Sequence, residues 1–151
     1  AFSTEGMVGY SLGKKDITLF KKIVQNSFIL SSITGLIISI IYFLINNYVI
    51  NLMSDIEKIR NLSSSYAVWL IIMPLISSFC FQFDGIFIGV SQTKELRNAM
   101  IFSVFSYLAI SIFLTDLMGN TGVWISLCIF MILRALSLYY YMDRIYLKFN
   151  K

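Results

Sequence analysis

The chain has 151 residues, of which 58% are hydrophobic and only 13% are charged, whereas soluble domains carry about 25% charged residues. A soluble fold of this length cannot bury so much apolar surface, so the composition predicts a membrane protein. The sequence contains no His, which excludes His-based catalysis and His metal sites. The net charge of +4 is explained below by basic residues at helix ends, and it needs no nucleic-acid partner.

Long apolar runs without alternating polar residues predict helices and not a β-barrel. We expect an all-α, polytopic membrane helix bundle with about four and a half transmembrane helices. The segment 1–13 is apolar but shorter than the roughly 20 residues that a span requires, so we interpret it as half of a helix that begins in a missing upstream portion. Complete spans are expected at 23–45, 66–91, 97–115 and 120–142.

The joints between these spans set the expected orientation. The joint at 46–65 is the only one long enough for a short amphipathic surface helix, and a charged loop is the alternative. Most basic residues fall on one side of the membrane, which the positive-inside rule makes cytoplasmic together with the C-terminus. These basic residues are Lys14, Lys15, Lys21, Lys22, Lys94, Arg97, Arg144, Lys148 and Lys151. A bacterial-type inner (plasma) membrane fits this bias.

Three ionisable residues interrupt the apolar spans: Glu5, Asp84 and Arg134. Such residues are costly within a bilayer and therefore indicate functional sites. Each lies nine or ten positions before the charged residue at the cytoplasmic joint or end that follows it, which at 1.5 Å per residue is roughly 14 Å. The sequence therefore predicts that the three side chains share one layer, either in an ion-coupling site or in a substrate cavity.

Two acids and one guanidinium leave one negative charge in surplus. One acid is expected to pair with Arg134, while the other is free to bind H⁺ or Na⁺. The alternative is a static pair of Arg134 with Asp84, with Glu5 facing a cavity formed by the missing portion. The uncharged polar residues Gln25, Asn26, Ser77 and Gln82 could line a polar path, or could join helices as Ser and Thr commonly do.

Nothing in the sequence favours an enzyme. We find no phosphate-binding Gly loop, no cluster of metal ligands and no nucleophile with a partner base. No cofactor is expected, and the predicted partners are the lipid bilayer, the missing N-terminal portion and a small organic substrate.

Five segments resemble one family of transporters. They are Glu5-Gly-Met-Val-Gly-Tyr-Ser-Leu-Gly-Lys-Lys-Asp16, Asp84-Gly-Ile-Phe-Ile-Gly89 with Thr93-Lys-Glu-Leu-Arg-Asn98, Gly119-Asn-Thr-Gly-Val-Trp124, and Arg134-Ala-Leu-Ser-Leu138. They are similar to helix ends and hairpins of the multidrug and toxic compound extrusion (MATE) transporters, in their DinF-like branch. Tyr10 stands where that family often has Gln.

The resemblance implies that residues 1–151 supply the end of helix 8 through helix 12 of a 12-helix, two-lobe transporter. Such a protein would exchange organic, cationic or amphipathic compounds for H⁺ or Na⁺. Asp84 matches an acid of the sodium-coupled branch, although the distance from Asp84 to the next joint is shorter here. The alternatives are a lipid-linked oligosaccharide flippase of a neighbouring family, or a small membrane subunit that transports nothing.

Overall fold

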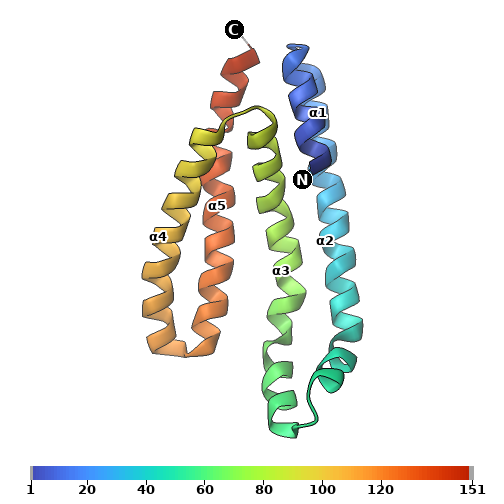
Figure 1. Ribbon diagram of the computed structural model, residues 1–151, viewed down its shortest axis with the longest axis vertical. Helices are drawn as coiled ribbons and strands as arrows, with labels where there is room; N and C mark the ends of the chain where they lie inside the picture. The colour runs from blue at the N-terminus through green and yellow to red at the C-terminus, as the bar shows by residue number, and fades with distance from the viewer. Residues whose placement is uncertain (1, 150–151) are drawn as a thin grey trace.

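The computed structural model describes residues 2–149 and places nearly all of them in helices (Figure 1). The helices are α1 (Phe2–Gly13), α2 (Ile17–Met53), α3 (Glu57–Gly89), α4 (Thr93–Met118) and α5 (Asn120–Phe149). No strand occurs within residues 2–149, and α2 to α5 are each long and apolar enough to cross a membrane. The prediction of an all-α membrane bundle is therefore confirmed.

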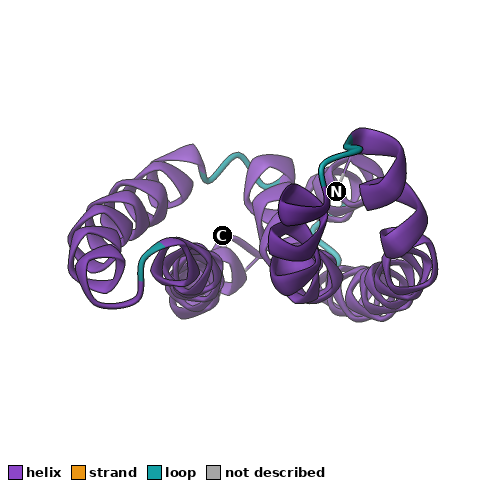
Figure 2. Cartoon of the chain, turned by 90° about the horizontal axis from the view of Figure 1, so that it is seen from below, coloured by secondary structure: helices purple, strands orange, loops and turns teal. Residues whose placement is uncertain are grey.

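The helices lie roughly parallel to one long axis. Figure 1 shows α4 and α5 side by side on one side of the chain and α1 to α3 on the other, and the end-on view of Figure 2 shows an elongated cross-section. The joints α1–α2 and α3–α4 and the end of α5 lie at one end of the chain, which we call the basic end because Lys14, Lys94 and Arg144 lie there. The joints α2–α3 and α4–α5 lie at the opposite end.

Three helices extend well beyond the predicted spans. The span expected at 23–45 is part of a helix that runs from Ile17 to Met53, and the span expected at 66–91 lies in a helix that begins at Glu57. The last helix continues from the expected end at 142 to Phe149. The predicted joint at 46–65 is almost entirely helical, because only residues 54–56 lie outside α2 and α3. No separate surface helix forms there. Hydropathy reports only the apolar part of a helix, whereas backbone hydrogen bonding continues into polar surroundings.

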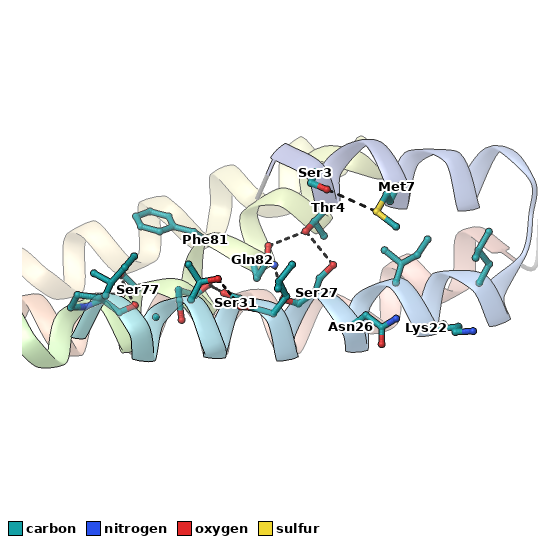
Figure 3. Close-up of a pocket in the computed structure, with 18 residues that line it drawn as sticks. Ser3, Thr4, Met7, Lys22, Asn26, Ser27, Ser31, Ser77, Phe81 and Gln82 are labelled. Atoms are coloured by element: carbon teal, nitrogen blue, oxygen red, sulfur yellow. Dashed lines mark hydrogen bonds between the residues drawn. The ribbon is translucent and has the colours of Figure 1, made fainter. Parts of the chain in front are cut away.

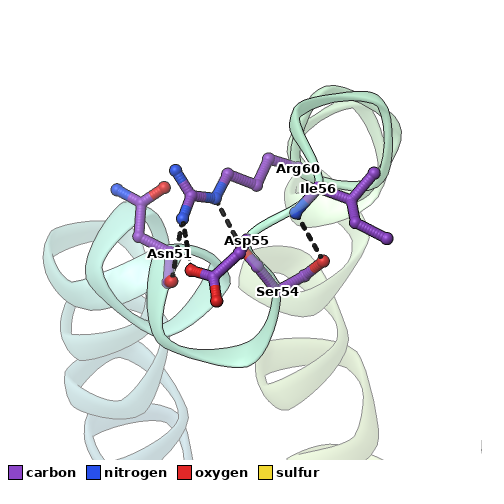
Figure 4. Close-up of polar contacts among 5 residues, drawn as sticks. All are labelled: Asn51, Ser54, Asp55, Ile56 and Arg60. Carbon is purple, nitrogen blue, oxygen red and sulfur yellow. Dashed lines mark hydrogen bonds and ion pairs between the residues drawn. The ribbon is translucent and has the colours of Figure 1, made fainter.

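Arg60 stabilises the turn between α2 and α3 (Figure 4). Its Nε donates to the carbonyl oxygen of Ser54 at 2.5 Å, and its Nη2 donates to the carbonyl oxygen of Asn51 at 3.3 Å and to the carboxylate of Asp55 at 3.3 Å. The last carbonyl groups of a helix lack partners within the helix. The Arg60 guanidinium, at the start of α3, therefore donates hydrogen bonds to two carbonyl groups at the end of α2.

The joints α1–α2 and α3–α4 share one backbone pattern. In each, a residue with positive φ follows the helix end: Lys15 at 54° and Ser91 at 55°. The same two hydrogen bonds close both turns, and they define the Schellman motif. The bonds run from Asp16 N to Ser11 O at 3.1 Å and from Lys15 N to Leu12 O at 2.9 Å, and from Gln92 N to Phe87 O at 2.9 Å and from Ser91 N to Ile88 O at 2.9 Å. The chain thus contains a repeated helical hairpin.

The hydrophobic core lies at the basic end. Its buried members are Val8, Phe20, Ile23, Ile86, Phe87, Val90, Ala99, Leu138, Met142, Ile145 and Phe149. The last turns of α5 belong to it, since Phe149 packs against Phe20 of α2 with ring centroids 4.9 Å apart. Towards the opposite end, large apolar side chains such as Phe43 and Ile112 are exposed, as expected for helices that face lipid or further protein.

Small residues set the closest helix approaches. A Cβ on Gly122 would collide with the backbone of Leu114, so α4 and α5 touch backbone to backbone there. A Cβ on Gly89 would lie 2.5 Å from the carbonyl oxygen of Glu5, which brings α1 against α3. Gly35 of α2 lies in the same way against Pro74 and Ser78 of α3. Membrane helices commonly pack through such positions.

Candidate functional site

An ion pair joins α3 to α5 within the predicted spans. Arg134 Nη2 donates to Asp84 Oδ2 at 2.8 Å, and the two side chains are 12% and 14% exposed, respectively. The pair is monodentate, because the buried atoms Asp84 Oδ1 and Arg134 Nε have no hydrogen-bond partner among residues 2–149. Each charge is neutralised by the other, while one carboxylate oxygen keeps its full capacity to accept a proton or a hydrogen bond.

Glu5 lies outside this pair. Its backbone contacts Gly89, which is five residues, or about 7.5 Å, beyond Asp84 along α3. Among residues 2–149, the half-buried Glu5 carboxylate takes part in no ion pair and no side-chain hydrogen bond. The structure therefore brings Asp84 and Arg134 together and does not bring Glu5 into contact with either.

A second polar group joins three helices (Figure 3). The hydroxyl of Thr4 on α1 donates to Gln82 Oε1 on α3 at 3.1 Å and also lies 3.2 Å from the hydroxyl of Ser27 on α2. Gln82 Nε2 donates to the carbonyl oxygen of Ser27 at 2.8 Å. Thr4 and Gln82 are buried, so these bonds satisfy polar groups that have little access to water. We call Thr4, Ser27 and Gln82 the three-helix polar cluster.

The polar cluster forms part of the wall of a cavity of about 670 Å³ between α1, α2 and α3. Most of the exposed area of the wall is apolar, although many of its residues are polar: Ser3, Thr4, Lys22, Asn26, Ser27, Ser31, Thr34, Ser77, Ser78 and Gln82. Three of the residues suggested by the sequence as a polar lining, Asn26, Ser77 and Gln82, lie in this wall. Gln25 is exposed and lies outside it.

None of the three ionisable candidates lines this cavity. Glu5, Asp84 and Arg134 are all absent from its wall, whose one ionisable member is Lys22. The cavity and the ion pair therefore lie on different sides of α3: Gln82 points towards α1 and α2, whereas Asp84 points towards α5. Within residues 2–149, no group of three or more acidic or Cys side chains is placed to hold a metal ion.

Thr4 and Ser27 were not singled out from the sequence. Ser and Thr occur throughout the spans, and neither spacing nor hydropathy marks the few that bond across helices. One available signal was Gln82, a long amide on an otherwise apolar stretch, because a buried amide needs partners on neighbouring helices.

Comparison with known proteins assigns the chain to a family. Residues 1–117 match the family described as MatE, which covers more than half of the chain. The chain belongs to the MatE family. The predicted recognition is thereby confirmed at the level of the family, and the MatE chain is a multi-pass membrane protein.

One curated relative of this MatE chain is the "DNA damage-inducible protein F" of Escherichia coli (strain K12), which is 29% identical over 138 residues. The match covers 91% of this chain and 30% of the relative, so the chain spans less than a third of that protein's length. No solved structure matches the chain significantly.

Proposed function

We propose that this MatE chain forms the C-terminal part of a cation-coupled antiporter, driven by H⁺ or Na⁺, that exports organic cationic or amphipathic compounds. The proposal rests on which acid forms the ion pair with Arg134. Arg134 pairs with Asp84, so Glu5 of α1 is the one of the two candidate acids that has no ion-pair partner among residues 2–149.

The ion pair and Glu5 then have different roles. Asp84 and Arg134 neutralise each other and join α3 to α5, so neither can bind another ion without breaking the pair. Glu5 can take up a cation without first breaking a bond, because no group among residues 2–149 competes for its oxygens. We assign binding of the coupling ion to Glu5.

The cavity between α1, α2 and α3 supplies the substrate path. Its wall combines large apolar surfaces with hydroxyl and amide groups, which suits molecules that have an apolar body and a few hydrogen-bonding atoms. Thr4 connects the two parts of the mechanism, because it lines the cavity and directly precedes Glu5 on α1. Any movement of α1 that accompanies ion binding at Glu5 would therefore also move the cavity wall.

The family assignment favours this function over the alternatives. MatE membership supports a transporter more than a non-transporting subunit or an enzyme, and it names a family other than that of the oligosaccharide flippases. The expected partners are the remaining N-terminal portion of the protein, the bilayer and the substrate. The basic end is expected to face the cytoplasm of a bacterial-type inner membrane.

The test uses the complete protein in sealed vesicles, with export of an amphipathic cationic dye driven by an imposed H⁺ or Na⁺ gradient. Glu5→Gln should abolish gradient-driven export while Glu5→Asp retains part of it. Glu57→Gln removes an exposed acid at the opposite end of the chain and serves as the matched control. Gradient-driven export by Glu5→Gln equal to wild type would sink the assignment of Glu5, and loss of export only in Asp84→Asn would transfer it to Asp84.

A further inference from the structure

A groove on the other side of the molecule has no role in the proposed transport cycle. It lies between α4 and α5, has a volume of about 400 Å³ and is lined by Asn98, Ala99, Phe102, Leu133, Leu136, Ser137, Tyr140 and Tyr141. Leu136 and Tyr140 are 58% and 79% exposed, so the groove is open from outside in the described chain. From Leu133 to Tyr140 it extends about 10 Å along α5.

The groove has one apolar end and one polar end. Phe102 and Leu133 lie deeper along the helices, whereas Asn98, Tyr140 and Tyr141 lie nearer the basic end. Tyr side chains with an apolar ring and a polar hydroxyl prefer the boundary between hydrocarbon and headgroups. The groove therefore runs from the depth of the acyl chains to the depth of the lipid phosphates.

Positive charge lies directly beyond the polar end. Arg144 is one helical turn past Tyr140 and Tyr141, with its guanidinium 5.1 Å from the Tyr141 ring centroid. Lys94 is one turn before Asn98 on α4 and is exposed. On α4 and α5 the basic end carries Lys94, Arg97, Arg144 and Lys148 against two acids, Glu95 and Asp143.

Arg144 retains donors for a further anion. Its Nη1 donates to Glu95 at 3.1 Å, and its side chain is 60% exposed. A guanidinium has five N–H donors, and this one makes no other hydrogen bond within residues 2–149. The remaining N–H groups are suited to phosphate oxygens, which Arg commonly binds in pairs.

We propose that the α4–α5 groove binds one anionic phospholipid from the leaflet on the basic side. An acyl chain lies along Phe102, Leu133 and Leu136, and the phosphate lies between Arg144 and Lys94. Basic pockets between membrane helices on the cytoplasmic side recognise anionic headgroups in this way. A soluble anion would gain nothing from the apolar part of the groove, and a zwitterionic lipid would gain little from the two cations.

The complete protein, reconstituted in nanodiscs that contain equal amounts of phosphatidylglycerol and phosphatidylcholine, provides the test. Lipid retained after extraction is measured by native mass spectrometry. Wild type should retain phosphatidylglycerol preferentially, and Lys94→Gln with Arg144→Gln should weaken this preference roughly fivefold for each charge removed. The control pair, Lys14→Gln with Lys58→Gln, removes the same charge away from the groove and should change nothing.

A third variant tests the apolar part. Leu136→Trp fills the groove without altering any charge, and it should also reduce phosphatidylglycerol retention. Arg144→Lys, which keeps the charge, should retain most of the preference, and the thermal unfolding temperature of each variant confirms its folding. Equal retention of the two lipids by wild type overturns the proposal. So does an effect of the charge variants without an effect of Leu136→Trp, because that result indicates general surface attraction and no groove.

Discussion

Asp84 of α3 and Arg134 of α5 approach each other to 2.8 Å in the part of the chain that is expected to cross the membrane. The two residues are separated by 50 positions and by the whole of α4, so the pair fixes how the hairpin α4–α5 docks on α3. Elsewhere α3 and α5 meet through uncharged side-chain contacts, such as the hydrogen bond that the Cys128 thiol donates to Met73 Sδ at 3.6 Å. The contact of Asp84 with Arg134 is the one ion pair between α3 and α5 within residues 2–149.

Breaking this pair from one side should be costly. Arg134→Gln leaves the buried Asp84 carboxylate without a counter-charge, and such changes cost about 3–5 kcal/mol. We expect a large drop in the unfolding temperature of the complete protein in detergent, followed by circular dichroism. The double variant Asp84→Asn with Arg134→Gln should recover much of the loss, because no uncompensated charge remains.

The exposed ion pair provides the comparison. Arg144 and Glu95 lie 3.1 Å apart with Arg144 mostly in solvent, so Arg144→Gln should cost about 0–1 kcal/mol. An equally small effect of Arg134→Gln would contradict a buried, mutually dependent pair.

A second prediction concerns the joint between α3 and α4. Ser91 has a positive φ of 55°, and a residue with a side chain pays about 1–2 kcal/mol for this conformation, whereas Gly adopts it freely. Ser91→Gly should therefore raise stability by about 1 kcal/mol, measured as an increase in unfolding temperature. Ser64→Gly, in the helical and exposed first half of α3, should lower stability by about 0.5 kcal/mol, because Gly is a poorer helix former than Ser. A loss of stability in both variants would exclude the strained turn.

The three-helix polar cluster leads to a third prediction. Thr4→Val keeps the shape of the side chain but removes the hydroxyl that bonds to Gln82 and Ser27. Hydrogen bonds between membrane helices contribute about 0.6 kcal/mol on average and up to about 1.7 kcal/mol, so the loss should be about 1 kcal/mol. Thr4→Ser should restore most of it, and an unfolding temperature of Thr4→Val above that of Thr4→Ser would show that the cluster does not stabilise the contact.

The sequence predicted well what depends on local pattern. The four complete spans each correspond to one long helix, because an apolar segment within a bilayer must satisfy its backbone hydrogen bonds internally. The helices extend beyond the spans that hydropathy indicates. The charged residues Asp55, Glu57 and Arg60 end the apolar run, but Arg60 caps α2 and so lets helical structure continue to within three residues of α3.

The site was predicted less completely because it depends on which helices are neighbours. Counting residues from the joints placed Asp84 and Arg134 at a similar depth, and they do meet. The same count placed Glu5 at that depth. However, α1 packs against α3 with the Glu5 backbone beside Gly89, which is about 7.5 Å beyond Asp84 along α3. Depth can be counted along a sequence, whereas the axial offset and facing of two helices depend on close contacts that one helix alone does not reveal.

The tightest of these contacts gives the last prediction. In α5, a Cβ at Gly122 would overlap the carbonyl group of Leu114 in α4 and crowd the backbone nitrogen of Thr115. These are backbone atoms within a helix, so they cannot move aside as a flexible side chain would. Gly122→Ala should force the two helices apart at the opposite end of the chain and cost about 1–3 kcal/mol, as overpacking of a tight contact does.

Gly6 is the matched control, because a Cβ there meets nothing within 4 Å. Gly6→Ala should stabilise α1 slightly, since Ala is favoured over Gly within a helix by about 1 kcal/mol. Unfolding temperatures of both variants in the complete protein measure the difference. A cysteine pair at Leu114 and Thr121, tested for disulfide formation with and without Gly122→Ala, reports directly on the separation of α4 from α5. Undiminished cross-linking together with an unchanged unfolding temperature would show that the two helices do not need the glycine.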